Sequence, residues 1–595
     1  MNTITKRLEQ LRTLMRGRNI SYYLIPTSDF HQSEYVGEHF KERSYMSGFT
    51  GSAGTLLVGI EKAYLWTDGR YFVQAKRQLE ESDIELMRIG VEGVPTISEF
   101  LTEHLKEGDI LGFDGRVVSA KLGETYLKLT GQKHGSIYTA EDLVDLIWND
   151  RPQLPSGKVW ILEESYAGET ALDKIERLRK KMKEEHANVH LLTSLYDIAW
   201  LLNLRGADIE HVPVVMSFLI VYLDQCVLYI NPENIDDKVA IYLEQIGVNR
   251  KPYESVYDDL AQFMDRRVLA QKSIINYRMG ELLQGNEIIN RPNPTEMMKC
   301  IKNETELRNT VLAHVKDGVA MTRFMYYLKT GYGKEHMTEL STTQVLEELR
   351  KKQEGFLDLS FDTIAAYGEH GAMMHYAATK ESDVKLGDGF FLVDSGGHYL
   401  EGTTDITRTF CFGELTKKQK EHYTITLKSN LALANAKFLK GTRGSNLDIL
   451  AREPFWEIGM DYKCGTGHGV GHILNVHEGP NSFRWRVIDE AALDAVLEEG
   501  MITTDEPGVY LEGEYGIRLE NELICREGIK NENGQFMEFE VITYCPFDLD
   551  GVDKTLMSKK EIAWLNQYHD LVYRIISPHL SPEEKQWLKK ATREI

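Results

Sequence analysis

Two stretches in the first half of this chain repeat the same order of helix, strand and turn signals, and this repeat constrains the fold most. Residues 6–15 and residues 173–182 are amphipathic segments with apolar residues at helical spacing. Each is followed by a short apolar strand signal, at residues 22–25 and 189–192. We therefore predict a duplicated α/β domain. The alternative is that two unrelated α/β units share the pattern by chance.

The length of the chain predicts further domains after this repeat. It has 595 residues, and domains usually contain roughly 100–200 residues, so we expect three or four units. Segments rich in Pro, Gly and Asn at residues 151–157 and 290–294 predict linkers. The last 50 or so residues have the apolar stripe of a helix that packs on its neighbour. The predicted domains are 1–152, 153–294, 295–546 and 547–595, in the fold class α/β (α+β).

Charge and composition exclude several classes of protein. Lys and Arg total 69 against 91 Asp and Glu, a net charge of -22, which argues against a nucleic-acid partner. The longest apolar stretch, residues 212–223, is too short for a bilayer span of about 20 residues, so we expect no membrane partner. The N-terminus has no apolar signal region, and the six scattered cysteines form no C-x-x-C pair. We expect a cytoplasmic protein.

Five residues of the second half stand within or beside apolar strand signals. They are Asp394, Asp405, His468, Glu506 and Glu520. Each alone has a simple explanation as a turn cap or a solvated charge. Together they predict a cation, because a lone carboxylate is costly to bury. Ion pairing with Arg408 or Arg518 is the competing explanation.

Four carboxylates and one imidazole suit a pair of divalent metal ions. The four negative charges balance two doubly charged ions, and a hydroxide bridging the ions would serve as a nucleophile in hydrolysis. Oxygen-rich ligands favour Mn²⁺ over a metal that prefers sulfur, with Zn²⁺ or Co²⁺ as alternatives.

The motifs around these residues carry a family resemblance. They read G-A-M-M-H-Y-A, V-D-S-G-G-H-Y-L-E-G-T-T-D-I-T-R-T, G-T-G-H-G-V-G-H-I-L-N-V-H-E-G-P, D-E-P-G-V-Y and G-I-R-L-E-N. These strings resemble the motifs of the pita-bread metallopeptidases and are most similar to the aminopeptidase P branch. Near the N-terminus, S-D-F-H-Q-S-E-Y and W-T-D-G-R-Y-F resemble the first domain of its long, three-domain cytosolic form.

This resemblance implies an activity and roles for particular residues. It implies an Xaa-Pro aminopeptidase, which acts on peptides with proline at the second position, and a pita-bread fold for residues 295–546. The five residues would bind two metal ions, commonly manganese, with Glu506 as general acid and base, and His468 would also border the substrate. By motif match, His375 and His477 would contact the substrate at the scissile bond, and Arg70 would reach the peptide. Relatives of this kind are commonly homodimers.

Simpler explanations of three of these residues stay open. His375 and His477 could be buried histidines with structural partners, and Arg70 could form a surface ion pair. Cys464 departs from the family pattern, because relatives usually carry a histidine four residues before the metal-binding His468. We expect Cys464 to change rate or specificity and to leave the metals in place. The alternative is a thiol that binds a soft metal or is easily oxidised.

Other functions compete with the aminopeptidase hypothesis. A prolidase would cleave only dipeptides, and the two leading domains disfavour it. A metal-free binding protein on the same scaffold would lack ligands, whereas all five are present here. A creatinase-like hydrolase of a small molecule is disfavoured for the same reason.

Overall fold

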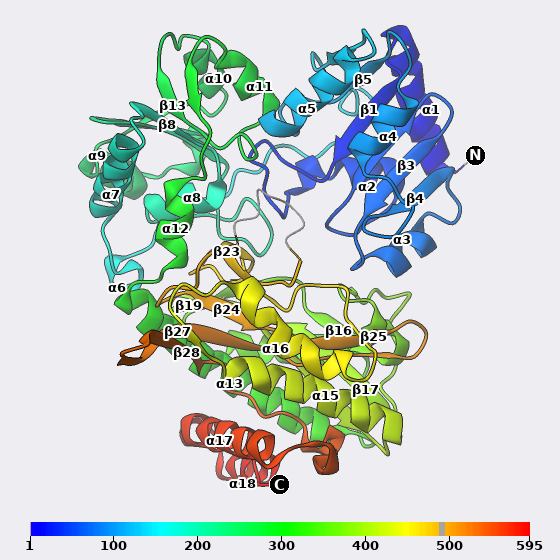
Figure 1. Cartoon of the computed structure of the whole chain (residues 1–595), viewed down its shortest axis with the longest axis vertical. Coiled ribbons are helices and arrows are strands. Elements are labelled where there is room, and N and C mark those ends of the chain that lie inside the picture. Colours follow the sequence, from blue (N-terminus) through cyan, green and yellow to red (C-terminus); the bar gives the residue numbers. More distant parts are fainter. Residues whose placement is uncertain (1, 487–493) are drawn as a thin grey trace. The chain divides into compact units, whose positions relative to one another are not determined.

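The computed structural model describes residues 2–486 and 494–595, and these form two compact units (Figure 1). The N-terminal unit comprises Met1–Leu162 and Glu169–Thr295, and the C-terminal unit comprises Glu163–Gly168 and Glu296–Ile595. The division after Thr295 lies next to the second predicted linker. The four predicted domain boundaries themselves stay predictions.

The N-terminal unit contains two lobes whose sheets match strand for strand. The strand orders are β4-β3-β2-β1-β5-β6 and β12-β11-β10-β8-β13-β14. In each lobe the first strand pairs antiparallel with the next strand of the sheet and parallel with the strand on its other side. Shared strand order and direction confirm the predicted pair of similar α/β domains. The strands are β1 (Tyr22–Pro26), β2 (Thr55–Gly59), β3 (Ala63–Thr67), β4 (Ile84–Arg88), β5 (Ile110–Gly112), β6 (Ser136–Tyr138), β8 (Val189–Leu192), β10 (Ser217–Tyr222), β11 (Cys226–Ile230), β12 (Val248–Lys251), β13 (Arg267–Leu269) and β14 (Glu287–Ile289).

The two predicted amphipathic segments are the first helix of each lobe. Helix α1 (Thr3–Gly17) begins after Asn2, whose side chain accepts a hydrogen bond from the Thr5 amide, and it buries Leu8, Leu11 and Met15. Helix α7 (Ala171–Glu184) begins after Thr170 in the same way. The other main helices are α2 (Glu42–Ser47), α3 (Phe72–Gln78), α4 (Ile97–His104), α5 (Ala120–Gly131), α8 (Leu195–Leu201), α9 (Asp237–Gln245), α10 (Ser255–Leu260) and α11 (Tyr277–Leu282).

The C-terminal unit builds its core from curved antiparallel sheets covered by long helices (Figure 1). One sheet has the order β16-β17-β20 and another has the order β21-β28-β27-β24-β22-β23. The strands are β15 (Phe356–Leu359), β16 (Ile364–Tyr367), β17 (Gly389–Ser395), β18 (Gly397–Tyr399), β19 (Gly402–Thr403), β20 (Ile406–Phe412), β21 (Lys437–Leu439), β22 (Gly467–Gly469), β23 (Glu478–Phe483), β24 (Ile502–Asp505), β25 (Gly508–Leu511), β26 (Tyr515–Arg518), β27 (Asn521–Asn531) and β28 (Gly534–Val541). The helices are α12 (Pro294–Cys300), α13 (Glu304–Gly331), α14 (Glu339–Lys351), α15 (Lys417–Ala434), α16 (Gly444–Trp456), α17 (Lys559–Ile576) and α18 (Pro582–Ala591).

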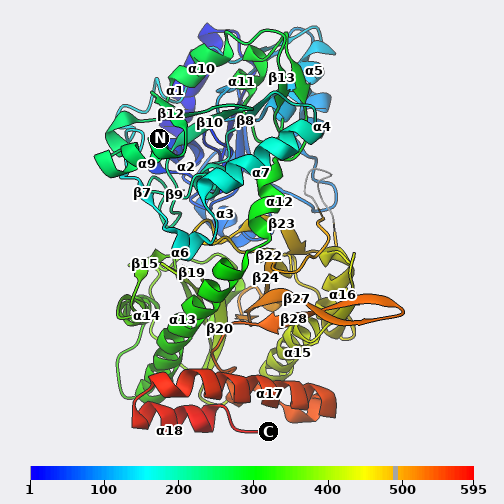
Figure 2. The ribbon, with the colours of Figure 1, turned by 90° about the vertical axis from the view of Figure 1, so that its left-hand side faces the viewer.

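The C-terminal helices pack on the rest of this unit, as predicted. Helix α17 buries Leu565, Val572 and Ile576 completely. Helices α17 and α18 contact α13, and Figure 2 shows them crossing its end. Within the described residues, no helix has the length and apolarity needed to cross a bilayer.

Candidate metal centre

The five predicted ligands lie in strands, directly after a strand or in the breaks between strands. Asp394 lies near the end of β17, His468 lies in β22, and Glu506 directly follows β24. Asp405 lies in the break between β19 and β20, beside a strand and not within one. Its amide donates to the Glu522 carboxylate at 2.7 Å, which takes the place of a strand hydrogen bond.

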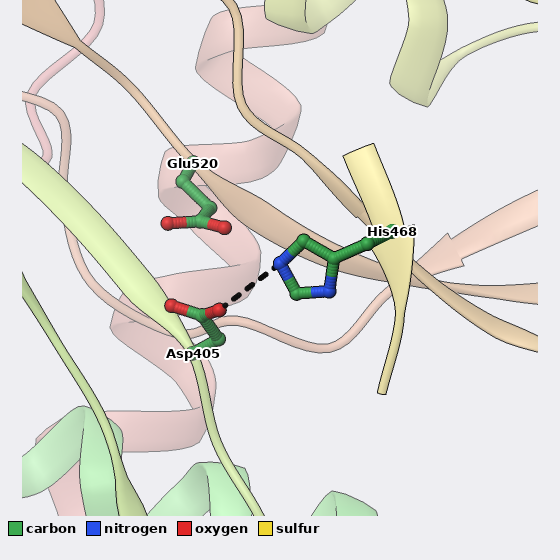
Figure 3. Close-up of side chains that lie close together, drawn as sticks. All are labelled: Asp405, His468 and Glu520. Atoms are coloured by element: carbon green, nitrogen blue, oxygen red, sulfur yellow. Dashed lines mark ion pairs between the residues drawn. The ribbon is translucent and has the colours of Figure 1, made fainter. Parts of the chain in front are cut away.

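Three of the five side chains converge in space. Asp405, His468 and Glu520 each offer one ligand atom, and these atoms lie within 4.8 Å of one another (Figure 3). His468 Nε2 is 3.4 Å from Asp405 Oδ2 and 3.5 Å from Glu506 Oε1. His468 Nδ1 lies 2.9 Å from the Gly469 carbonyl oxygen. A carbonyl only accepts, so Nδ1 carries the hydrogen, and Nε2 is the ring nitrogen that would bind a metal ion. A cation placed between Nε2 and the two carboxylates would be bound by all three groups.

The charges around these side chains require compensation. Burial raises the pKa of Asp405 well above its usual value, and the carboxylates of Asp394 and Glu506 raise it further. Burial also raises the pKa of Glu520, as do Asp405 and Glu506. Asp394 Oδ1 and Asp405 Oδ1 are buried and make no hydrogen bond within the described residues. Divalent cations would neutralise the carboxylates and use these oxygens, so the residues present fit metal ions.

Arginine accounts for one of the four carboxylates. Arg518 forms a buried ion pair with Asp394, and it also donates to Thr407 Oγ1 at 3.1 Å. Arg408 instead donates to the backbone carbonyls of Glu520 and Cys545. The competing explanation by ion pairing therefore applies to Asp394, whereas Asp405 and Glu520 face other carboxylates.

The histidines with predicted substrate roles lie in the same unit. The His477 ring is perpendicular to the His468 ring, with centroids 4.3 Å apart. His375 is half-buried. The carbonyl of the preceding Met374 accepts from Arg518 at 3.4 Å, which ties this segment to the partner of Asp394. The structure thus brings the His375 segment and His477 to the predicted metal ligands, and their substrate roles stay predictions.

Arg70 lies in the other unit and has a partner of its own. Its Nε and Nη2 donate to the two carboxylate oxygens of Asp68, each at 2.9 Å. This bidentate pair matches the simpler explanation of an ion pair, and the predicted contact with the peptide stays a prediction.

Cys464 has the environment of an unreactive thiol. Burial and then the negative charge of Glu506 raise its pKa to about 12. A thiol of that pKa stays protonated at neutral pH, and the thiolate is both the nucleophile and the metal ligand. This disfavours the predicted alternative of an easily oxidised thiol, and the alternative of a soft-metal ligand stays a prediction.

Two buried residues beside the site escaped the sequence analysis. Glu522 follows Glu520 by two residues, and strand alternation could have pointed to it. His314 lies on α13, and its Nε2 is 3.0 Å from Glu522 Oε1. No local pattern marks His314, because its partner lies far away in the sequence.

Family models match most of the chain. Residues 7–146 and 150–306 each match the Creatinase/Prolidase N-terminal domain. Residues 310–527 match Metallopeptidase family M24, and residues 535–595 match the C-terminal region of peptidase_M24. The fold and the site thus define an M24 metallopeptidase with two creatinase-type domains ahead of a pita-bread domain.

Full-length relatives narrow this class. Aminopeptidase P1 of Arabidopsis thaliana is 36% identical, with 99% of both chains covered. A probable Xaa-Pro aminopeptidase P of Laccaria bicolor is 37% identical, covering 98% of this chain and 93% of the relative. The crystal structure of X-prolyl aminopeptidase from Caenorhabditis elegans, described as a cytosolic enzyme with a di-nuclear active site, superposes with a TM-score of 0.95 at 33% identity over the whole of both chains. This chain belongs to the aminopeptidase P family, also called the Xaa-Pro aminopeptidases.

Proposed function

We propose that this enzyme is a dinuclear metal-dependent aminopeptidase that releases the N-terminal residue from peptides with proline in second position. The observation that carries the proposal is the convergence of Asp405, His468 and Glu520, whose ligand atoms lie within 4.8 Å of one another. Relatives named for Xaa-Pro aminopeptidase activity align along the full chain and support the substrate class.

The ligand set follows from the same residues. Asp394, Asp405, His468, Glu506 and Glu520 would hold two divalent ions, with Mn²⁺ favoured by the oxygen-rich set and Zn²⁺ or Co²⁺ as alternatives. When bound, the two ions would supply a hydroxide nucleophile at neutral pH and would polarise the scissile carbonyl.

Protein side chains would handle the proton and the peptide. Glu506 takes a proton from the nucleophile and returns it to the leaving proline nitrogen, and Thr504 Oγ1 orients it by donating to Oε1 at 3.2 Å. His477 donates to the oxygen that gains charge, while His375 and Arg70 bind the peptide. The proline nitrogen of the substrate carries no N–H, so the pocket must accept a ring where other peptides offer a donor.

Removal and replacement of metal test this proposal. Treatment with a chelator should abolish cleavage of an Xaa-Pro-Yaa tripeptide, and adding back one metal at a time should restore it, with Mn²⁺ most effective. Rapid cleavage of the tripeptide separates an aminopeptidase from a prolidase, which would prefer the Xaa-Pro dipeptide. Full activity after complete metal removal, verified by elemental analysis, would refute the metal-dependent mechanism.

The role of Glu506 has its own test. Glu506→Gln should lower kcat by about 10²–10⁴-fold in the presence of Mn²⁺, because proton transfer by a positioned side chain contributes that much. Glu512→Gln, a substitution at an exposed position of the following hairpin, is the matched control.

We also propose a cytoplasmic homodimer. Light scattering on the purified protein measures the oligomeric state, and a monomer at working concentration would contradict it.

A further inference from the structure

Glu522 is a buried carboxylate beside the metal ligands that the proposed mechanism does not use. It lies on β27 and is fully buried, with its side chain 0% exposed. The three ligand atoms that converge come from Asp405, His468 and Glu520, and Glu522 is outside this group. A fifth acidic side chain in this buried site adds repulsion between carboxylates, so we expect Glu522 to have a role of its own.

The contacts of Glu522 define that role. Its Oε1 accepts the Asp405 amide at 2.7 Å, and Asp405 stands in the break between β19 and β20 where strand pairing is interrupted. The Glu522 amide donates to Thr543 Oγ1 at 2.8 Å, which anchors the backbone of Glu522 itself. Glu522 therefore replaces the missing strand partner of Asp405 and fixes the backbone from which that carboxylate projects.

His314 holds Glu522 in place. His314 Nδ1 lies 2.8 Å from the Thr310 carbonyl oxygen on α13, so Nδ1 carries a hydrogen. His314 Nε2 lies 3.0 Å from Glu522 Oε1, and the His314 side chain is only 3% exposed. Burial lowers the pKa of His314, but the Glu522 carboxylate raises it by more, so the net shift is upward and favours a charged ring that balances Glu522.

We infer that Glu522, held by His314, is a positioning residue that orients Asp405 for metal binding. This inference rests on the proposed function, in which Asp405 is a metal ligand. Partners behind the metal ligands commonly change metal affinity by about 10–100-fold when they are mutated. The alternative role for Glu522 is that of a direct metal ligand, and the two roles respond differently to a neutral acceptor at this position.

Two double variants isolate the hydrogen bond. Both carry His314→Leu, so that no charged partner is left unpaired in the core. Glu522→Gln keeps an oxygen that can accept the Asp405 amide, whereas Glu522→Leu does not. Glu527→Leu, on an exposed position of the same strand, is the matched control.

The measurement is the Mn²⁺ dissociation constant of metal-free full-length protein, obtained by calorimetry and from the electron paramagnetic resonance signal of free Mn²⁺. We expect the variant with Leu at position 522 to bind one Mn²⁺ about 10–100-fold more weakly, and the variant with Gln to remain within about threefold of the wild type. Circular dichroism and melting of the metal-free proteins verify that both variants fold.

The other possible results contradict either the positioning role of Glu522 or the proposed function. Equal Mn²⁺ affinity of the folded Leu variant and the wild type overturns the positioning role. A loss in the Gln variant as large as in the Leu variant also overturns it and favours direct coordination. If the folded wild type itself binds no Mn²⁺, Zn²⁺ or Co²⁺, the proposed function fails and the inference with it. If the variant with Leu at position 522 does not fold, Glu522→Ala combined with His314→Leu replaces it, because Ala also lacks an oxygen for the Asp405 amide, and the same criteria apply.

Discussion

Neutralising Glu520 should change the stability of this enzyme in opposite directions without and with metal. In the metal-free protein, Glu520 and Asp405 place carboxylate oxygens within 4.8 Å of each other in a buried site. Two unit charges at that separation repel by about 3.5 kcal/mol at an effective dielectric constant of about 20. Burial and these neighbours raise the pKa of Glu520, so a proton relieves part of the repulsion. We therefore expect Glu520→Gln to stabilise the metal-free protein by about 1–2 kcal/mol.

In the metal-bound protein, Glu520→Gln should lower the stability instead of raising it. Ions that bind only the folded state at 100 times their dissociation constant stabilise it by about 2.7 kcal/mol. If Glu520→Gln weakens binding about 100-fold, the same ion concentration stabilises the variant by only about 0.4 kcal/mol. The increase in stability on adding Mn²⁺ should therefore almost disappear in the Glu520→Gln variant.

Thermal melts of both proteins, with and without Mn²⁺, check this prediction. In a unit of this size, 1 kcal/mol corresponds to a change in Tm of roughly 2 °C. Glu527→Gln, at an exposed position on β27, is the control and should change neither melt by more than about 1 kcal/mol. A metal-free Glu520→Gln protein that melts below the wild type, or that gains as much from Mn²⁺, would show that Glu520 does not belong to a repulsive metal-binding cluster.

Three further predictions concern other buried groups. His569 accepts the Phe547 amide at 3.2 Å, and burial lowers its pKa to about 3. Because the unfolded histidine titrates near 6.5, the unfolded state binds the extra proton between these values and stability rises with pH. Because of this residue, the free energy of unfolding measured in urea should be about 2 kcal/mol lower at pH 5 than at pH 7. His569→Gln should remove this difference. Lys302 forms a buried ion pair with Glu478, so Lys302→Met should cost about 3 kcal/mol in urea unfolding, and a cost below 1 kcal/mol would contradict this. Brief iodoacetamide treatment at pH 7.5 should leave the partly buried Cys464 unmodified by mass spectrometry, since its pKa is about 12, and rapid labelling would refute the assignment of an unreactive thiol.

Much of the fold could be predicted because its signals are local. The amphipathic spacing of residues in α1 and α7, and the apolar strands that follow them, depend only on neighbours in the chain. The apolar stripe of α17 predicted its packing in the same way. The break in strand pairing at Asp405 could not be predicted, because it depends on a hydrogen bond to a residue 117 positions away.

Local sequence patterns were enough to predict two similar α/β domains ahead of a domain with acidic metallopeptidase motifs, because helical and strand periodicity and the short motifs lie within continuous segments. Which carboxylates face one another depends instead on how distant segments pack. The tertiary structure placed Arg518 against Asp394, and it set Asp405 beside Glu522 and Glu522 beside His314. Such contacts join strands and helices that are distant in the chain, and their energies depend on burial and on partners that no local pattern specifies.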